Sequence, residues 1–267
     1  MLESHARAAR RFDFSWPAQM KIKAHVIQET ELSQNTGRDG QDQWVLWDVD
    51  DVVTETSPEI YRAMLKMTGR DLPWEQWQHH DFVESYGIGV ERIPEMIDIW
   101  HQEKILEKAK VYEGVKAAMD ALVADGYKVG MITARGWHVR GREVTEDMIN
   151  EERLPVSRLI VLQYVDSKAE TIKNSGLLVR GFIDDTTRHA LGCSQLGIPS
   201  VLRSQPWNAD ALDLLHLDNV RDFPQFIRSA NSGLGHVTRS SAQAVAQVSP
   251  LEAAMQASTP RRKGPSR

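Results

Sequence analysis

Cysteine is nearly absent from this chain of 267 residues, since Cys193 is the only one. A single thiol excludes a disulfide within the chain, and it suits a reducing compartment. Cys193 lies in the segment HALGCSQLG, whose spacing is typical of a packed helix, so we expect a structural role for it. The sequence also has no apolar run near the roughly 20 residues that a membrane-spanning helix needs. We therefore expect no membrane partner.

A secretory signal is not recognisable either. The first twenty residues contain Arg7, Arg10 and Arg11 and no apolar centre. The acidic residues Glu3 and Asp13 argue against an organelle-targeting peptide. The expected location is the cytoplasm.

An excess of positive charge is missing as well. The formal net charge is −5, and the last 39 residues carry +4, so the rest of the chain is near −9. A surface that binds duplex nucleic acid needs clustered positive charge, so we do not expect a nucleic-acid partner. With 41% hydrophobic and 26% charged residues, the composition is that of an ordinary soluble globular protein. The length suffices for one large α/β domain or for a core with an insertion.

The strongest signal that is present lies in residues 44–54, WVLWDVDDVVT. An apolar strand leads directly into acidic residues, and α/β proteins bind ligands beyond the carboxyl ends of their strands. Because strand side chains repeat every two residues, Asp48 and Asp50 should share one side. Close carboxylates need a cation or a shared proton, and hard oxygen ligands favour Mg²⁺. The pattern indicates phosphate chemistry with Asp48 as nucleophile, and the alternative is a plain acidic turn.

From residue 111 onward, strand and helix patterns alternate along the chain. This alternation predicts a parallel sheet with right-handed crossovers. The expected strands are 44–49, 127–133, 158–162, 179–183 and 199–202, with helices at 115–125, 139–152, 168–174 and 188–196. An edge strand at 21–28 is a further expectation.

The domain organisation follows from these patterns. Residues 57–110 have helical spacing and no convincing strand, which predicts a helical cap inserted into the core. The core itself would comprise 43–56 and 111–228. Residues 1–42 are polar and irregular and would form a partly disordered N-terminal extension. Residues 229–267 are rich in Ser, Ala, Gln, Gly and Pro and predict a disordered basic tail.

Three later features fall where a phosphate site would need them, and the first is a strand that ends at Thr133. Its hydroxyl, with the backbone of Ala134 after it, could hold phosphate oxygens. A simple helix cap is the alternative for Thr133. The next residue, Arg135, could reach a phosphate or a sugar.

The second and third features are a lysine and a pair of acids. The ammonium of Lys168 could neutralise the nucleophile and the transferred phosphoryl group, although Lys173 competes for this role. Asp184 and Asp185 end another apolar strand and could complete a Mg²⁺ site with Asp48. A capped turn is the alternative for this acidic pair.

In this order, the D-x-D-x-V segment at 48–52, the strand ending at Thr133, Lys168 and the Asp184–Asp185 pair resemble the haloacid dehalogenase (HAD) superfamily of phosphohydrolases. The resemblance covers about 44–205. It implies an α/β fold with a Rossmann-like three-layer parallel-sheet core, a small helical cap inserted after the first strand, and Mg²⁺ as cofactor.

The resemblance also implies residue roles, carried over by position. Asp48 would be the nucleophile and Asp50 the general acid and base. Phosphate would be bound by Thr133, Ala134 and Lys168. The metal would be held by Asp48, Asp50, Asp184 and Asp185.

Within the superfamily, TARG at 133–136, FIDD at 182–185 and QPWN at 205–208 resemble the 5′(3′)-deoxyribonucleotidase group. The N-terminal extension and the basic tail depart from that compact pattern. The expected partner is a small phosphate ester, chosen as a (deoxy)nucleoside monophosphate. Two alternatives stay open: a phosphatase that acts on the 3′ end of a nucleic acid, and a non-catalytic binding protein on the same scaffold. A homodimer is also left open.

The predicted cap is rich in aromatic residues. Aromatic faces can stack on a nucleobase, at roughly 1–3 kcal/mol per base, and packing within the cap is the alternative for any one of them. The candidate substrate-binding residues are Arg135 of the core and Trp74, Trp77, Phe82 and Trp100 of the cap.

Overall fold

The computed structural model describes residues 30–31, 42–79 and 82–232. The predicted edge strand at 21–28 and nearly all of the predicted tail lie outside these ranges. Helix α9 (Phe223–Asn231) runs past residue 229, where the tail was expected to begin.

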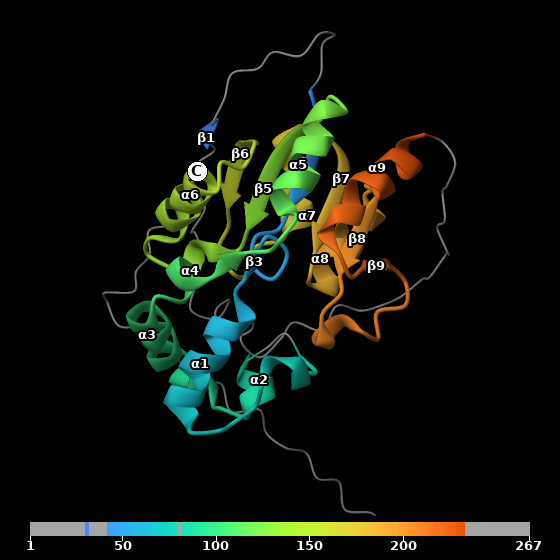
Figure 1. Ribbon diagram of the computed structural model, residues 1–267. Coiled ribbons are helices and arrows are strands. Elements are labelled where there is room, and N and C mark those ends of the chain that lie inside the picture. The colour runs from blue at the N-terminus through green and yellow to red at the C-terminus, as the bar shows by residue number, and fades with distance from the viewer. Residues whose placement is uncertain (1–29, 32–41, 80–81, 233–267) are drawn as a thin grey trace, which may run out of the picture.

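A parallel sheet forms the centre of the molecule (Figure 1). Within the described residues the strand order is β1-β6-β5-β2-β7-β8-β9, and all neighbours are parallel except β1, which is antiparallel to β6. The strands are β1 (Thr30–Glu31), β2 (Gln43–Trp47), β5 (Lys128–Thr133), β6 (Val156–Val161), β7 (Leu178–Asp184), β8 (Ser200–Arg203) and β9 (Leu215–Leu217). The predicted Rossmann-like α/β fold is confirmed. The sequence prediction missed β1 and β9 because two or three residues give too short a pattern.

Helices cover both faces of the sheet, which makes three layers (Figure 1). Strand β2 shows why: Val45 and Trp47 pack into the core on one face, and Trp44 and Leu46 pack into the core on the other. A strand that is buried on both sides carries a continuous apolar run, as residues 44–47 do. One face is covered by α5 (Val115–Ala124), α6 (Gly141–Glu151) and α9, and the other by α7 (Lys168–Ser175) and α8 (Thr187–Gln195).

The helical cap leaves and rejoins the core through a two-stranded stem. Strands β3 (Thr54–Glu55) and β4 (Lys110–Val111) pair antiparallel, so the two ends of the inserted segment lie side by side. Between them lie α1 (Ser57–Thr68), η2 (Trp74–Gln76), α2 (Phe82–Tyr86), η3 (Val90–Arg92), α3 (Ile93–Glu103) and α4 (Ile105–Lys108). Figure 1 shows this cap beyond one end of the sheet.

The cap has an apolar core of its own, which continues onto the α/β core. The buried side chains Val144 of α6 and Trp207 of η5 (Pro206–Asn208) belong to the same cluster as the cap residues. The half-buried rings of Trp137 and Tyr164 pack against that cluster from the core side. The cap is therefore docked on the core through a shared apolar seam.

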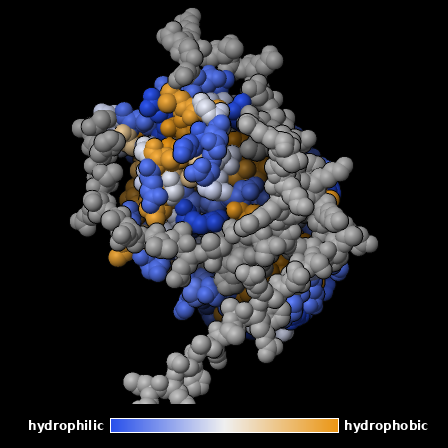
Figure 2. All heavy atoms as spheres, turned by 180° about the vertical axis from the view of Figure 1, so that it is seen from behind, coloured by the Kyte–Doolittle hydropathy of each residue, from blue (hydrophilic) through white to orange (hydrophobic). Residues whose placement is uncertain are grey.

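Among the helices that the structure describes, none is long and apolar enough to cross a bilayer. Seen from behind, the described surface mixes polar and apolar residues (Figure 2). A homodimer and a cytoplasmic location stay predictions.

Candidate functional site

The candidate site lies where the chain reverses its direction of travel across the sheet. Strand β2 comes first in the parallel sheet, the chain then builds β5 and β6 on one side of it, and β7, β8 and β9 follow on the other. Such a switch point leaves a crevice at the carboxyl ends of the strands, where α/β proteins bind ligands. Asp48 follows β2, Thr133 ends β5 and Asp184 ends β7, so the topology brings these three strand ends together.

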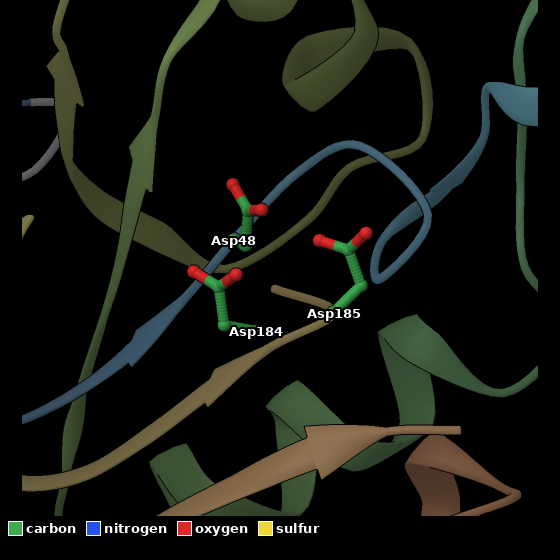
Figure 3. A group of neighbouring side chains, drawn as sticks. All are labelled: Asp48, Asp184 and Asp185. Atoms are coloured by element: carbon green, nitrogen blue, oxygen red, sulfur yellow. The ribbon is translucent and has the colours of Figure 1, made fainter. Parts of the chain in front are cut away.

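Three buried carboxylates meet at these strand ends. One oxygen from each of Asp48, Asp184 and Asp185 lies within 4.8 Å of the others. Figure 3 shows the three carboxylates pointing to the same side, beyond the ends of the strands that carry them. The structure thus gathers three of the four residues that the sequence proposed as metal ligands.

Lys168 joins two of these acids. Its Nζ lies 2.6 Å from Asp48 Oδ1 and 2.8 Å from Asp184 Oδ2, and the side chain is only 1% exposed. Burial by itself lowers the pKa of Lys168, but the attraction of Asp184 and Asp48 outweighs it and raises the pKa above its usual value. Ser167 begins helix α7 and accepts a hydrogen bond from the backbone of Glu170, which fixes the start of the helix that carries the lysine.

One ammonium does not balance three carboxylates. Burial, with Asp184 and Asp50 nearby, raises the pKa of Asp48 to about 7, although Lys168 opposes this. Burial and the neighbouring carboxylates also raise the pKa of Asp185 well above its usual value. A divalent cation would relieve the repulsion and let all three acids ionise. An all-oxygen set fits Mg²⁺ in ligand type and charge.

Asp50 lies two residues after Asp48, and its carboxylate is paired with Arg135. Its Oδ1 is 2.8 Å from Arg135 Nη2 and its Oδ2 is 3.0 Å from Arg135 Nε, while Thr56 Oγ1 donates to Oδ1 at 2.7 Å. Burial alone would raise the pKa of Asp50, but Arg135 and Thr56 hold it below the usual value. Its side chain is not part of the group of three clustered carboxylates, and the role of Asp50 as a metal ligand stays a prediction.

Arg135 is placed differently from the sequence prediction. Its side chain is 1% exposed, and its donors reach Thr145 Oγ1 at 3.0 Å and Thr54 Oγ1 at 3.2 Å besides Asp50. The guanidinium thus has three protein partners in the interior and holds Asp50 by a two-point contact, while its predicted contact with a phosphate or a sugar stays a prediction. The sequence could not show this, because Arg135 and Asp50 are 85 positions apart.

Thr133 carries a buried hydroxyl for which the described residues supply no partner. Its Oγ1 makes no hydrogen bond to them, and the residue is 0% exposed. A buried polar group without a partner is costly, so its presence calls for an explanation. A phosphate oxygen would satisfy the hydroxyl, and the backbone of Ala134 follows it at the same strand end. The phosphate-binding role of both residues stays a prediction.

The cap aromatics mostly pack on one another. Trp77 and Trp100 each meet Phe82 edge to face, with ring centroids 5.2 Å apart in both pairs. All three side chains are buried in the cap core. This burial favours packing, the alternative reading, and a role in stacking on a base stays a prediction. Among these four residues only Trp74 is half-buried rather than buried.

The segment 205–208 holds two of the acidic loops in place. Gln205 Nε2 donates to the backbone oxygen of Asp51 at 2.9 Å. From the same segment, Asn208 Nδ2 donates to the backbone oxygen of Asp185 at 2.7 Å, and Trp207 Nε1 donates to Asp185 Oδ2 at 3.0 Å. The sequence singled out QPWN only as a family resemblance. The Gln–Asn spacing of a capping box was the one local signal that this turn is rigid.

Asp51 ties the cap to the same loop. Its carboxylate accepts hydrogen bonds from the backbone of Thr56 and Ser57 and from Ser57 Oγ, at 3.1, 2.9 and 2.6 Å, at the start of helix α1. Its backbone is left-handed, with φ of 55°, a conformation that Asp tolerates better than most residues. The sequence analysis gave Asp51 no role, although it directly follows the paired acids.

Comparisons of sequence find nothing that matches this chain, neither a family model nor a curated protein. Comparison of structures does find similar folds. A phosphonoacetaldehyde hydrolase-like protein from Oleispira antarctica is 15% identical and has a TM-score of 0.54, over 77% of this chain and 98% of that one. A predicted phosphatase from Clostridium acetobutylicum is 15% identical with a TM-score of 0.53, over 71% and 100% of the two chains.

A third solved structure carries the family name. It is a HAD family hydrolase from Deinococcus radiodurans with bound phosphate and sodium, 16% identical with a TM-score of 0.50, over 72% of this chain and 98% of that one. The chain therefore has the fold of HAD-superfamily hydrolases and phosphatases, with a buried acidic cluster at its switch point. At 15–16% identity, the similarity to these structures establishes the fold and not the activity.

Proposed function

We propose that this protein is a Mg²⁺-dependent phosphomonoester hydrolase that works through an aspartyl-phosphate on Asp48. The observation that carries the proposal is the buried group of three carboxylates with Lys168 bridging two of them. Burial of several like charges side by side is costly, so acidic residues rarely cluster in a protein interior for structural reasons alone. Such clusters with perturbed pKa values are typical of functional sites. The HAD-like fold supports the same reading.

The proposed reaction assigns one role to each of these side chains. A carboxylate oxygen of Asp48 attacks phosphorus, the ester P–O bond breaks, and the leaving alcohol takes a proton from Asp50. Water then attacks the phosphorus, Asp50 takes its proton, and cleavage of the bond to Asp48 releases phosphate. Lys168 and the Thr133 hydroxyl would hold the phosphoryl oxygens in line. Mg²⁺ held by Asp48, Asp184 and Asp185 would supply neutralisation of the charge on the transferred group.

Asp50 suits the proton-transfer role. Its side chain keeps 31% exposure while Arg135 fixes its direction, so it is both oriented and accessible from solvent. The contact with Arg135 lowers the pKa of Asp50 and so favours the ionised carboxylate, which accepts a proton from the attacking water in the second step, whereas the first step requires Asp50 to enter protonated.

We propose a nucleoside monophosphate, in particular a deoxynucleotide, as substrate. The TARG, FIDD and QPWN segments support this choice, and the half-buried ring of Trp74 is the remaining candidate for contact with a base. The acidic body of the chain favours a mononucleotide over a nucleic-acid end.

A phosphatase panel with Mg²⁺ tests both levels of the proposal. It would contain an aryl phosphate, sugar phosphates, the 5′- and 3′-nucleoside monophosphates and an oligonucleotide with a 3′-phosphate. We expect the highest kcat/KM on a mononucleotide. Faster hydrolysis of sugar phosphates or of the oligonucleotide would reject the nucleotide proposal and keep the phosphatase. No Mg²⁺-dependent hydrolysis of any compound would favour the non-catalytic binding protein.

A further inference from the structure

We propose that Trp207 is a positioning residue that couples docking of the cap to binding of a divalent cation at Asp185. The inference rests on the proposed function in one respect, that Asp185 is a ligand of the cation. It requires nothing about the substrate.

The polar end of Trp207 is fixed on the acidic cluster. Its Nε1 donates to Asp185 Oδ2 at 3.0 Å, and Thr186 Oγ1 donates to the other oxygen at 3.3 Å. The turn that carries the indole is itself rigid, because Asn208 bonds the backbone oxygens of Asp185 and Arg203 and accepts from the backbone of Gln205. Partners that orient a ligand carboxylate in this way typically change metal affinity 10–100-fold when they are removed.

The apolar body of the same side chain belongs to the cap core. Trp207 is 9% exposed and lies in the apolar cluster formed mainly by cap residues. Its ring centroid is 6.0 Å from that of Trp77, at an interplanar angle of 36°. Trp77 is anchored within the cap by its own Nε1, which donates to the backbone oxygen of Leu72 at 3.1 Å.

One rigid side chain thus makes both contacts. Motion of the cap away from the core would remove the apolar partner of the indole and loosen the hydrogen bond that orients Asp185. Since coupling between two binding events is reciprocal, cation binding should in turn stabilise the docked cap. Trp207 lies 22 positions from Asp185 and 130 from Trp77 along the chain, so only the folded structure brings these three side chains into contact.

The first test removes the indole N–H and keeps an aromatic ring. In Trp207→Phe, measured on the full chain by isothermal titration with Mg²⁺ alone, we expect binding weaker by about 10–100-fold. Trp137→Phe is the matched control, because Trp137 also packs at the seam, with its ring 5.3 Å from that of Trp100. We expect this control to bind Mg²⁺ within about twofold of wild type, since no contact joins Trp137 to the acidic cluster among the described residues.

The second test removes the cap partner and keeps the hydrogen bond. Trp77→Leu should weaken Mg²⁺ binding several-fold. In the double variant Trp77→Leu/Trp207→Phe, the loss of Mg²⁺ binding free energy should be smaller than the sum of the losses in the two single variants. The third needs no variant: hydrogen exchange of the backbone amides around 74–77 should slow when the wild type is saturated with Mg²⁺.

The outcomes separate cleanly. Unchanged Mg²⁺ affinity in Trp207→Phe, or unchanged exchange in the wild type, overturns the coupling. Weak binding in Trp207→Phe with normal binding in Trp77→Leu also overturns it, because Trp207 would then act on Asp185 alone. A wild type that binds no Mg²⁺ rejects the metal in the proposed function together with this inference. A wild type that binds Mg²⁺ and passes these tests, but hydrolyses no phosphate ester, rejects only the proposed activity.

Discussion

At the residue scale, the molecule concentrates charge where water is excluded. Lys168, Asp48 and Asp184 are all at least 92% buried at the side chain, and the transfer of such charged groups out of water is costly. The arrangement fits the proposed function, in which these charges act on a phosphoryl group and a cation.

The first prediction concerns the nucleophile. Asp48→Asn keeps the shape of the side chain and removes the charge, so turnover of an aryl phosphate with Mg²⁺ should be abolished while the circular-dichroism spectrum stays that of wild type. The asparagine cannot form the acyl phosphate. Appreciable activity in the purified variant would remove Asp48 from the role of nucleophile.

The second prediction concerns Arg135, which orients Asp50. Arg135→Lys keeps the positive charge and loses the two-point contact with the carboxylate, so kcat should fall about tenfold or more. Because Arg135 holds the pKa of Asp50 below its usual value, that pKa should rise in the variant. The acidic limb of the kcat–pH profile should therefore move to higher pH.

A separate measurement distinguishes this role from general damage. Mg²⁺ affinity in Arg135→Lys should stay close to wild type, because Arg135 contacts Asp50 and two threonines and none of the three clustered acids. An unshifted pH profile with a reduced kcat would show that Arg135 acts on something other than Asp50.

At the scale of elements, the short segments at the seam have more influence on the site than the long helices. The turn η5 holds Asp185 and the loop of Asp51, and η4 (Arg135–Trp137) leads into His138. The rings of His138 and of His101 on cap helix α3 are 4.3 Å apart. The seam between cap and core therefore contains two imidazoles in contact.

The third prediction is a pH dependence of this seam. Burial, with His101 and the arginines 135 and 140 nearby, lowers the pKa of His138 to about 4, although Glu107 opposes this. The unfolded chain binds a proton near the ordinary pKa of about 6.5. The contribution of neutral His138 to the free energy of unfolding is therefore fully present above about pH 6.5. It falls as the pH drops and is lost near pH 4.

His138→Asn keeps an acceptor for the backbone N–H of Arg140 and removes the titration. Between pH 6.5 and 4 the Tm of this variant should decline less steeply than that of wild type. The difference should be roughly 2–8 °C, which corresponds to about 1–2 kcal/mol after allowance for solvent screening. Thermal melts across this range provide the measurement. The exposed His79 gives the control, since His79→Asn should melt with the wild-type pH dependence.

At the scale of the whole molecule, the acidic cluster lies at the carboxyl ends of β2 and β7 and is bonded to Trp207, which packs in the cap core, so a cation there should stabilise the fold. A ligand that binds only the folded state at 100 times its Kd adds about 2.7 kcal/mol. We expect saturating Mg²⁺ to raise Tm by roughly 5–10 °C for a chain of this size and EDTA to reverse the shift.

The matched control for this fourth prediction is Asp185→Asn, which removes one ligand charge and keeps an acceptor for Trp207. Its Tm should respond to Mg²⁺ much less than that of wild type. An equal response in both proteins would place the cation somewhere other than the acidic cluster.

Much of the fold could be predicted from local patterns. The apolar run of β2, Gly126 after α5 and Gly176 after α7 are short-range signals, and the predicted core strands and helices lie close to those observed. Strands β1 and β9 were missed, since they gain their stability from pairing with β6 and β8 rather than from their own sequence.

For the site, residue type and position at strand ends were sufficient to propose Asp48, Lys168, Asp184 and Asp185 as one group. These residues follow apolar strands or begin a helix, and a parallel sheet brings its carboxyl ends to one edge by topology alone. The sequence therefore determined the fold class and the charged centre.

Only the tertiary structure decided how the remaining groups are used. Arg135 holds Asp50, Trp77 and Phe82 pack within the cap, and Trp207 donates to Asp185. Each of these arrangements depends on contacts between side chains that are distant in the chain, or on whether a given side chain is buried in the core or left exposed. Both are settled by packing, which the pattern of residue types along the chain does not encode.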